Sequence, residues 1–380
     1  MSKKIFIKAY SSVSSLGHQD QSIVSSIRNH TSTILEKYGK HVACLPENSE
    51  FALKKFIENH PQYEKLDRSI QLVLWMGEQL KQSNLIKQNT GINVSSSRGA
   101  SHYWEEQHKQ YLEKNNLSVY TSPNTTLGNV SSYLGGFLNT NKISFSHSIT
   151  CSSALHSICN AYAWLKSGLS ESFICGGTES CISPFSLEMF DTMGIYSKSV
   201  NPYPSTPLFS DNTSNKMILG EGAGLFYLDT DPTNAIAEIE GIGFASETLK
   251  HPADISKDGI AYQNSMQEAC KNTSLKDIDY VLMHAPGTLK GDQSEVFAIN
   301  TTFGKGEVNM FSTKYLYGHS LGASGALNID FALRMFKHNI QPQFPYKTSC
   351  IHIPKPPKRV LINASGFGGN TVSILLRKIV

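Results

Sequence analysis

The strongest constraint on the fold is an alternation of short apolar runs, typical of β-strands, with stretches typical of helices. Six runs have strand composition: Ser172–Cys175, Leu225–Leu228, Ala235–Phe244, Tyr280–Met283, Val360–Asn363 and Thr371–Leu376. Strands that alternate with helices predict an α/β architecture. The pattern breaks at residues 229–234, which read Asp-Thr-Asp-Pro-Thr-Asn. We therefore expect two halves, residues 1–229 and residues 235–380.

Composition excludes several classes of function. A net charge of +3 over 380 residues is too small to indicate a nucleic-acid partner. Seven scattered cysteines without metal-ligand spacing favour a reducing compartment and disfavour a disulfide framework or a metal site. No stretch is long and apolar enough to span a membrane, and residues 1–8 lack the apolar centre of a signal peptide. We therefore expect a cytoplasmic protein.

Cys151 lies where a predicted strand, Lys142–Ile149, meets a predicted helix. The helix shows Leu155, Ile158, Tyr162 and Leu165 on one face, with Gly168 just past its end. A thiol at the N-terminus of a helix is near a partial positive charge, which favours the thiolate, the form that attacks acyl carbonyls. The alternative is a small buried core residue, the usual state of a lone cysteine.

Six segments in chain order, this turn among them, resemble one enzyme family. The segments are Ile5–Gly17, Thr150–Ser153, Cys175–Glu179, Gly220–Gly224, residues 312–325 with Lys314 and Gly318-His319, and Asn363–Asn370. Together they resemble the β-ketoacyl-acyl-carrier-protein synthases, the condensing enzymes of fatty acid and polyketide synthesis. The resemblance extends over nearly the whole chain, and motifs in this order are far more specific than any one glycine-rich piece.

The resemblance implies an α/β fold of the thiolase type, in which two pseudo-repeated βαβαβ halves form five layers, α-β-α-β-α. It implies a decarboxylative Claisen condensation between an acyl thioester on Cys151 and malonyl-acyl carrier protein, without a metal or organic cofactor. The family is dimeric, so we expect a homodimer or a heterodimer with a second ketosynthase-like subunit.

The resemblance also assigns the oxyanion site. The amide of Cys151 and that of Phe367, between Gly366 and Gly368, would bind the oxyanion, and Phe367 would also gate the acyl tunnel. Paired backbone donors suit acyl transfer. The alternative for these glycines is an ordinary tight turn before the last strand.

His319, in a Gly-His-x-x-Gly-Ala context, resembles the family's second active-site histidine, which donates to the malonyl thioester oxygen. Lys314 and Glu295 match its supporting Lys and Glu, and we expect a buried ion pair that orients the site. The alternatives are a histidine satisfied within its loop and a solvent-exposed pair.

The family's first active-site histidine precedes a Gly-Thr pair, and alignment on Gly287-Thr288 puts Pro286 at that place. Proline can neither donate a hydrogen bond nor accept a proton, so Pro286 cannot replace that histidine. Either His284 substitutes, displaced by roughly 6–7 Å along a strand but on the same face, or the histidine is lost. We favour His284, because the rest of the site is present. The family often has a second Ser or Thr two residues after the Thr of this motif, and Lys290 occupies that position here.

Substrate-binding positions are Thr288 and Phe190, the latter a candidate wall of the acyl pocket or plain core. The region from Tyr103 to Tyr120 resembles the family's dimer-facing and tunnel region but looks shortened, which suggests a specialised pigment, polyene or polyketide pathway.

Carrier protein is acidic, so a basic entrance would attract it. The candidates are Lys355, Lys358 and Arg359, with a solvated basic loop as the alternative.

Two other functions remain open. The chain could be a Cys-dependent acyltransferase or thioester hydrolase that uses Cys151 and His319 without forming a carbon–carbon bond. It could also be a chain-length partner subunit with impaired decarboxylation, although such partners lack the nucleophile that Cys151 would supply. Release of carbon dioxide from a malonyl thioester separates the condensing enzyme from both.

Overall fold

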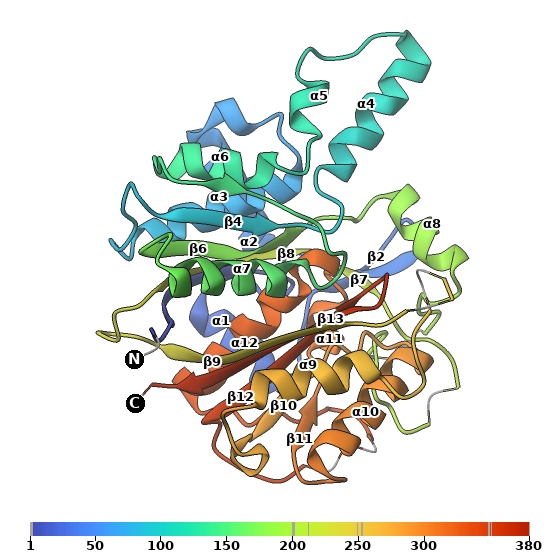
Figure 1. Cartoon of the computed structure of the whole chain (residues 1–380). Coiled ribbons are helices and arrows are strands. Elements are labelled where there is room, and N and C mark those ends of the chain that lie inside the picture. Colours follow the sequence, from blue (N-terminus) through green and yellow to red (C-terminus); the bar gives the residue numbers. More distant parts are fainter. Residues whose placement is uncertain are drawn as a thin grey trace.

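The computed structural model describes residues 3–199, 202–211, 213–248, 250–251, 254–348, 350 and 352–379. Its main feature is a ten-stranded sheet in the order β11-β10-β12-β13-β9-β1-β8-β6-β4-β5, seen edge-on as two stacked halves in Figure 1. A small separate sheet contains β2 (Ile34–Lys37), β3 (Lys40–Ala43) and β7 (Leu219–Gly220).

The two halves of the large sheet repeat one topology. The first contains β1 (Phe6–Val13), β4 (Gly91–Ser95), β5 (Ser144–Phe145), β6 (Ser172–Glu179) and β8 (Gly222–Asp229). The second contains β9 (Ala237–Ser246), β10 (Tyr280–Leu282), β11 (Asn309–Phe311), β12 (Arg359–Gly366) and β13 (Asn370–Lys378). In each half the last strand runs antiparallel to both neighbours, and the three strands beyond it are parallel. The halves meet where β1 pairs with β9.

Helices form the other three layers. Between the half-sheets lie α7 (Ser153–Ser167) and α12 (Ser324–His338), and residues 324–336 of α12 are all buried, as expected for a helix enclosed on every side. Outside the first half-sheet lie α3 (Arg68–Lys81) and α6 (Asn129–Leu138), and outside the second lie α9 (Ile260–Cys270) and α10 (Leu289–Phe303). Figure 1 shows these layers in sequence. The expected five-layer thiolase-type fold is confirmed.

Each of the six apolar runs expected to be strands coincides with a strand, although residues 235, 236 and 283 lie just outside β9 and β10. The strand expected over Lys142–Ile149 is wrong beyond β5, because the side chains that follow bond to helix α6 and to the loop after β4, and the backbone does not continue a ladder. Ser146 Oγ donates to Ser131 Oγ at 2.8 Å, and Ser148 Oγ donates to the carbonyl of Ser97 at 2.9 Å. The division of the chain near residues 229–235 stays a prediction: β8 ends at Asp229 and β9 begins at Ala237.

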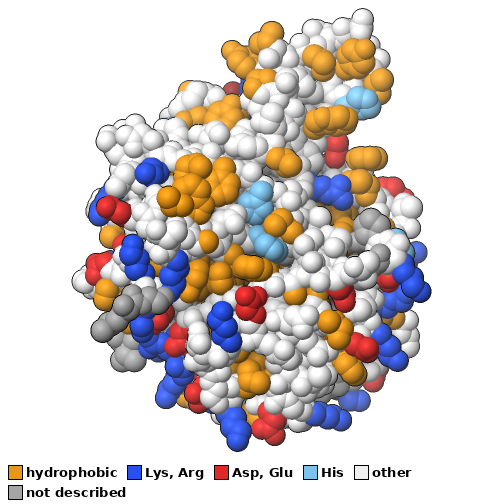
Figure 2. All heavy atoms as spheres, viewed as in Figure 1, with side chains coloured by type: hydrophobic (Ala, Val, Ile, Leu, Met, Phe, Trp, Pro, Cys, Tyr) orange, Lys and Arg blue, Asp and Glu red, His pale blue; other side chains and the backbone are white. Residues whose placement is uncertain are grey.

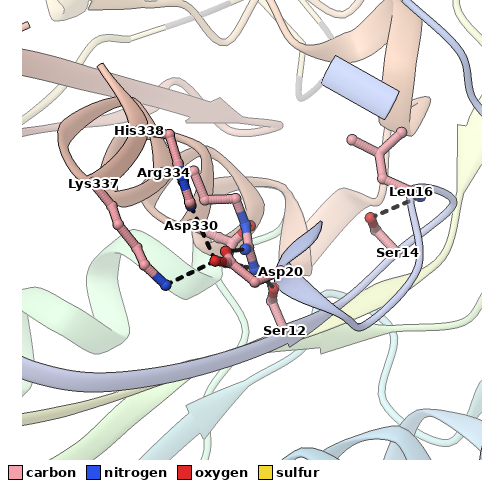
Figure 3. Close-up of polar contacts among 8 residues, drawn as sticks. All are labelled: Ser12, Ser14, Leu16, Asp20, Asp330, Arg334, Lys337 and His338. Atoms are coloured by element: carbon pink, nitrogen blue, oxygen red, sulfur yellow. Dashed lines mark hydrogen bonds and ion pairs between the residues drawn. The ribbon is translucent and has the colours of Figure 1, made fainter. Parts of the chain in front are cut away.

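A charged network joins the N-terminal segment to α12 (Figure 3). Arg334, only 3% exposed, pairs with Asp330 and with Asp20, the first residue of α1 (Asp20–Asn29). Ser12 of β1 donates to Asp330 at 2.7 Å, and Lys337 Nζ lies 2.7 Å from Asp20. Because a buried charge is tolerated only when it is paired, this network fixes the packing of α1 and β1 on the second half.

One region projects from the layered body, namely α4 (Ser101–Lys114) and α5 (Thr121–Asn124) (Figure 1). Large apolar side chains are exposed there, namely Trp104, Leu112, Val119 and Tyr120. Figure 2 shows hydrophobic side chains at the surface of this projecting region. The remaining helices of more than one turn are α2 (Glu47–Asn59) and α8 (Pro184–Thr192), and α11 (Lys314–Tyr317) is a single turn. Across the described ranges, no helix has the length and apolarity needed to cross a membrane.

Candidate active site

Cys151 lies at a tight turn two residues before α7. Thr150 has a φ of 48°, a left-handed conformation that reverses the chain, and Ser152 and Ser153 donate their amides to Ile149 and Thr150, each at 3.2 Å. Hydroxyl groups close the turn further, since Ser152 Oγ donates to Ile149 O at 2.8 Å. The turn places Cys151 at the N-terminal, positive end of a 15-residue helix.

The thiol is buried, with 6% of the residue exposed. Burial and, to a smaller extent, the nearby Glu179 carboxylate raise the pKa of Cys151 to about 12, against the opposing effect of the Arg98 and Lys314 charges. The neutral thiol is therefore the resting form near neutral pH, and the thiolate has to form along the reaction path.

The β12–β13 turn lies directly against this cysteine. A Cβ added to Gly366 would overlap Thr150 Oγ1 and would lie 3.2 Å from the backbone nitrogen of Cys151. Thr150 Oγ1 also donates to the carbonyl of Phe367 at 3.4 Å. Gly368, with a φ of 90°, allows the chain to reverse here. The segment is thus both a tight turn and a close neighbour of Cys151.

His284 and His319 lie side by side in the same cavity. His284 follows β10, and His319 follows α11, where its amide donates to the carbonyl of Ile218 at 2.7 Å. Their ring centroids are 5.2 Å apart with planes at 87°, an edge-to-face contact. Both side chains are buried.

Both imidazoles are neutral near pH 7. Burial, followed by the Lys314 charge, lowers the pKa of His284 to about 3. Burial, followed by His284 and Lys314, lowers the pKa of His319 well below its usual range. A neutral imidazole can donate one hydrogen bond to a developing oxyanion.

His284 reaches the cavity that contains Cys151, whatever its displacement from the position of Pro286. His284 contacts His319 directly, and Pro286 is another residue that lines the cavity. The chain leaves strand geometry after Leu282, so His284 lies in the segment that follows β10 and not in the strand itself. This placement favours the interpretation in which His284 provides the second imidazole.

The expected ion pair between Lys314 and Glu295 is not formed. Glu295 instead accepts the amides of His284 at 3.0 Å and Ala285 at 2.8 Å, and the Asn363 side chain at 3.0 Å. Those amides lie just beyond the last ladder pair of β10, and a buried carboxylate satisfies them. Lys314 Nζ is buried and has no hydrogen-bond partner among the described residues, and burial lowers its pKa to about 8.

Glu179 is a site residue whose role the sequence did not reveal. It is fully buried and accepts the amides of Ser97 at 2.8 Å and Gly322 at 3.0 Å. Ser97 follows β4, and Gly322 follows His319, so one carboxylate fixes two loops beside Cys151. Glu179 ends a motif recognised in the sequence, but nothing local indicates these partners.

The cavity has a volume of about 360 Å³. Cys151, His284 and His319 are among the polar residues that line it, and Phe190, Met217 and Phe367 contribute to its apolar lining. Thr288 also lines it, so the structure brings both predicted substrate-binding residues to the cavity. Within the described residues, no group of three or more His, Cys, Asp or Glu side chains could hold a metal ion.

Two of the basic candidates for carrier docking have acidic partners. Lys355 Nζ lies 2.7 Å from Asp279, and Arg359 Nε lies 2.7 Å from Glu240. Because these charges are already neutralised, the solvated basic loop is the better interpretation of this segment.

Most of the chain matches the two domain models of one protein family. Residues 11–233 match the family model "Beta-ketoacyl synthase, N-terminal domain", and residues 236–346 match "Beta-ketoacyl synthase, C-terminal domain". The chain is 26% identical to 3-oxoacyl-[acyl-carrier-protein] synthase 1 of Buchnera aphidicola, over 99% of this chain and 100% of that protein. It is 26% identical to synthase 2 of Staphylococcus aureus, over 93% and 92% of the two chains.

Solved structures with the same fold cover the entire chain. A β-ketoacyl synthase from Burkholderia phymatum superposes with a TM-score of 0.81 at 21% identity, covering 100% of both chains. The ishigamide ketosynthase/chain length factor superposes with a TM-score of 0.84 at 18% identity, again over 100% of both chains. A type II polyketide ketosynthase solved with its acyl-carrier protein gives a TM-score of 0.83 at 18% identity, also with 100% coverage of both.

Proposed function

The chain belongs to the β-ketoacyl synthase family and is a condensing acyltransferase-type enzyme, and from this premise we propose the roles of its site residues. Cys151 holds an acyl group as a thioester. His284 and His319 stabilise the enolate formed from malonyl-acyl carrier protein. The amides of Cys151 and Phe367 bind the oxyanion of the condensation step. The product is a β-ketoacyl thioester on the carrier, two carbons longer than the starting acyl group.

The first step transfers an acyl group from a carrier thioester to Cys151. The carbon–sulfur bond to the carrier breaks, the bond to Cys151 forms, and the cysteine proton ends on the departing carrier thiol. Since the thiol is the resting form, the nearby Lys314 and Arg98 charges and the start of α7 support the transient thiolate.

The second step breaks the bond between the malonyl carboxylate and its α-carbon, which releases carbon dioxide and leaves an enolate. Negative charge then develops on the thioester oxygen. Two neutral imidazoles donating to that oxygen stabilise this charge more than they stabilise the uncharged ground state. A cationic histidine would instead bind the malonyl carboxylate and oppose its loss.

The third step joins the enolate carbon to the carbonyl carbon of the thioester on Cys151. The tetrahedral oxyanion accepts hydrogen bonds from the backbone amides of Cys151 and Phe367. Support for this role comes from Gly366, which allows the turn that contains Phe367 to lie close to the turn that contains Cys151. Collapse breaks the bond to Cys151, and the released thiolate recovers a proton.

The observation that carries this proposal is the edge contact between two buried, neutral histidines in the cavity that contains Cys151. An acyltransferase or thioester hydrolase needs only one base beside its cysteine. A second imidazole is needed when an enolate forms, because it donates a second hydrogen bond to the enolate oxygen.

Acylation and decarboxylation assays test the proposal. Purified protein would be given a radiolabelled acyl thioester and, separately, malonyl-acyl carrier protein with a labelled carboxylate. We expect labelling of the wild type that Cys151→Ala abolishes, and labelled carbon dioxide release. Labelling without carbon dioxide would indicate the acyltransferase, and neither activity would indicate a partner subunit.

Two partners belong to this proposal. The first is acyl carrier protein, as the names of the relatives indicate for those proteins. The second is a ketosynthase-like subunit, either another copy or a different chain, packed on the edge strand β5 and on the projecting α4–α5 region with its exposed apolar side chains. Light scattering after size-exclusion chromatography separates these states, and a monomer would contradict the proposal.

We further propose a specialised pigment, polyene or polyketide pathway. A strain that lacks its housekeeping condensing enzyme provides the test. Failure of this gene to restore growth supports the specialised role, and full restoration overturns it.

A further inference from the structure

A second pocket, which we call the side hollow, lies next to the cavity that contains the cysteine. It has a volume of about 300 Å³, and the rings of Tyr203, Phe209 and Tyr346, several hydroxyl side chains and Lys216 line it. The three rings are only partly buried, so part of each ring surface is uncovered. None of the three proposed reaction steps uses this hollow.

One segment of the chain separates the side hollow from the cavity. Ser214 and Lys216 line the hollow, whereas Asn215 and Met217 line the cavity. This alternation is that of an extended chain, in which successive side chains point to opposite sides. The wall between the two pockets is therefore one backbone thick, about 5 Å, which is the width of one strand.

This wall is fixed to the turn between β10 and α10, at the rim of the cavity. The amide of Lys216 donates to the carbonyl of Gly287 at 2.7 Å, and the side chain of Asn215 accepts the amide of Leu289 at 2.9 Å. The next residue, Lys290, lines the cavity and is exposed, so the cavity opens to solvent beside this turn. A ligand that extends out of the cavity here passes Lys290 and reaches the hollow across Lys216.

Two lysines at this rim are available to bind an anion. Neither Lys216 nor Lys290 forms an ion pair with another residue in the described part of the chain. The acidic residue that lines the hollow, Asp211, pairs with Lys347 at 3.9 Å. The rim between the two pockets therefore has a net positive charge, which suits a phosphate group.

The aromatic side of the hollow suits a planar ring. The Tyr346 ring centroid lies 5.9 Å from that of Tyr203, with planes at 56°, and 6.0 Å from that of Phe209, with planes at 73°. The Tyr346 hydroxyl donates to the carbonyl of Pro207 at 3.0 Å, which holds this ring in place. A planar base can lie on the face of one such ring and meet the edge of its neighbour.

We propose that the side hollow binds the nucleotide of coenzyme A, so that acyl-coenzyme A thioesters load Cys151 directly. The base lies against Tyr346 and its neighbours, Lys216 and Lys290 bind phosphates, and the thioester end of the arm lies in the cavity. The inference rests on the proposed function, since it adds a donor to the same acylation step. The carbon–sulfur bond to coenzyme A breaks, the bond to Cys151 forms, and the cysteine proton ends on the coenzyme A thiol.

Binding of adenosine 3′,5′-bisphosphate tests the site without any activity. Isothermal titration calorimetry should give a dissociation constant below about 1 mM for wild type. Phe209→Ala, and separately the double variant Lys216→Met/Lys290→Met, should each weaken binding by roughly tenfold or more. Lys305→Met is the matched control, because Lys305 follows the other end of α10 and lines neither pocket. No binding by wild type up to about 5 mM bisphosphate would overturn the proposal.

Acylation kinetics test whether the nucleotide contributes to loading. Hexanoyl thioesters of coenzyme A, phosphopantetheine and pantetheine would be compared as donors to Cys151 by intact-protein mass spectrometry. In wild type the KM of the coenzyme A thioester should be roughly 10- to 100-fold below that of the pantetheine thioester. The double lysine variant should bring this ratio to within about threefold, and Lys305→Met should keep the wild-type ratio. Equal KM values for the coenzyme A and phosphopantetheine thioesters in wild type would overturn the nucleotide site, because the lysines would then recognise only the phosphate of a carrier-borne arm.

The two assays also separate this inference from the proposed function. If the bisphosphate binds with the expected variant pattern but no donor acylates Cys151, the proposed function fails and the nucleotide site is retained. If acyl-carrier protein acylates Cys151 but the bisphosphate does not bind, the proposed function is retained and the nucleotide site fails.

Discussion

Gly366→Ala is the substitution whose effect follows most directly from the structure. A Cβ at this position would overlap Thr150 Oγ1 and would lie 3.0 Å from Ile149 O and 3.2 Å from Cys151 N. Non-bonded heavy atoms normally stay about 3.5 Å apart, so relief needs a shift of roughly 1 Å. Two of the three neighbours are backbone atoms of the cysteine turn, and Thr150 already has a left-handed φ of 48°.

A shift of this size separates the amides proposed to bind the oxyanion. Loss of one such donor lowers kcat about 100- to 1,000-fold, and crowding of a packed site costs about 1–3 kcal/mol of stability. We therefore expect acylation of Cys151 to slow by at least 100-fold in Gly366→Ala while the protein remains folded. Single-turnover acylation, followed by intact-protein mass spectrometry, measures the rate, and thermal unfolding measures the stability.

Two further variants make the test specific. Thr150→Gly removes the atom that the new methyl group would strike and suits the left-handed φ, so the double variant should recover at least tenfold of the lost rate. Gly136→Ala on α6 is the matched control, because nothing lies within 4 Å of its added Cβ. If Gly366→Ala acylates Cys151 as fast as Gly136→Ala does, the close approach of the two turns has no role in catalysis.

Three other predictions concern the pocket, the charged network and pH. Phe190→Ala should cost about 3 kcal/mol of stability and shift preference toward longer acyl donors, measured by competition between donors, and an unchanged preference would show that Phe190 is plain core. Arg334→Met should lower the free energy of unfolding by about 3–5 kcal/mol in urea titrations, because it leaves Asp330 buried and unpaired, and a loss below 1 kcal/mol would contradict this. His284 cannot take up a proton above pH 3 in the folded state, so it makes stability fall as pH drops from 6.5, by up to about 1.4 kcal/mol per pH unit. His284→Asn should lower the wild-type slope by that amount but not abolish it, because the buried neutral His319 contributes a slope of the same sign, and identical slopes in the two proteins would refute a neutral buried His284.

Local sequence patterns were sufficient where a feature depends on neighbouring residues. The helix after Cys151 and the strands flanking the Gly366–Gly369 turn follow from side-chain periodicity, and the structure has both. The motifs around Cys151 and His319 identified the family. The resemblance to that family also indicated Phe190 and Thr288 as substrate-binding residues, and both line the cavity.

Features that depend on distant partners could not be predicted. Glu179 ends a motif recognised in the sequence, but only the fold brings the amides of Ser97 and Gly322 to its carboxylate. Glu295 was expected to pair with Lys314, but amides left free at the end of β10 bind it first. The position of His284 depended on where β10 ends, which a run of apolar residues does not define.

The central claim is that His284 and His319 act together on a malonyl thioester beside Cys151. The most direct measurement is carbon dioxide released from malonyl-acyl carrier protein, with the condensation product counted in parallel, for wild type, His284→Ala and His319→Ala. The account predicts one carbon dioxide per product in wild type and a loss of roughly 100-fold or more in each variant, with acylation of Cys151 retained. Release by His284→Ala at the wild-type rate would contradict it.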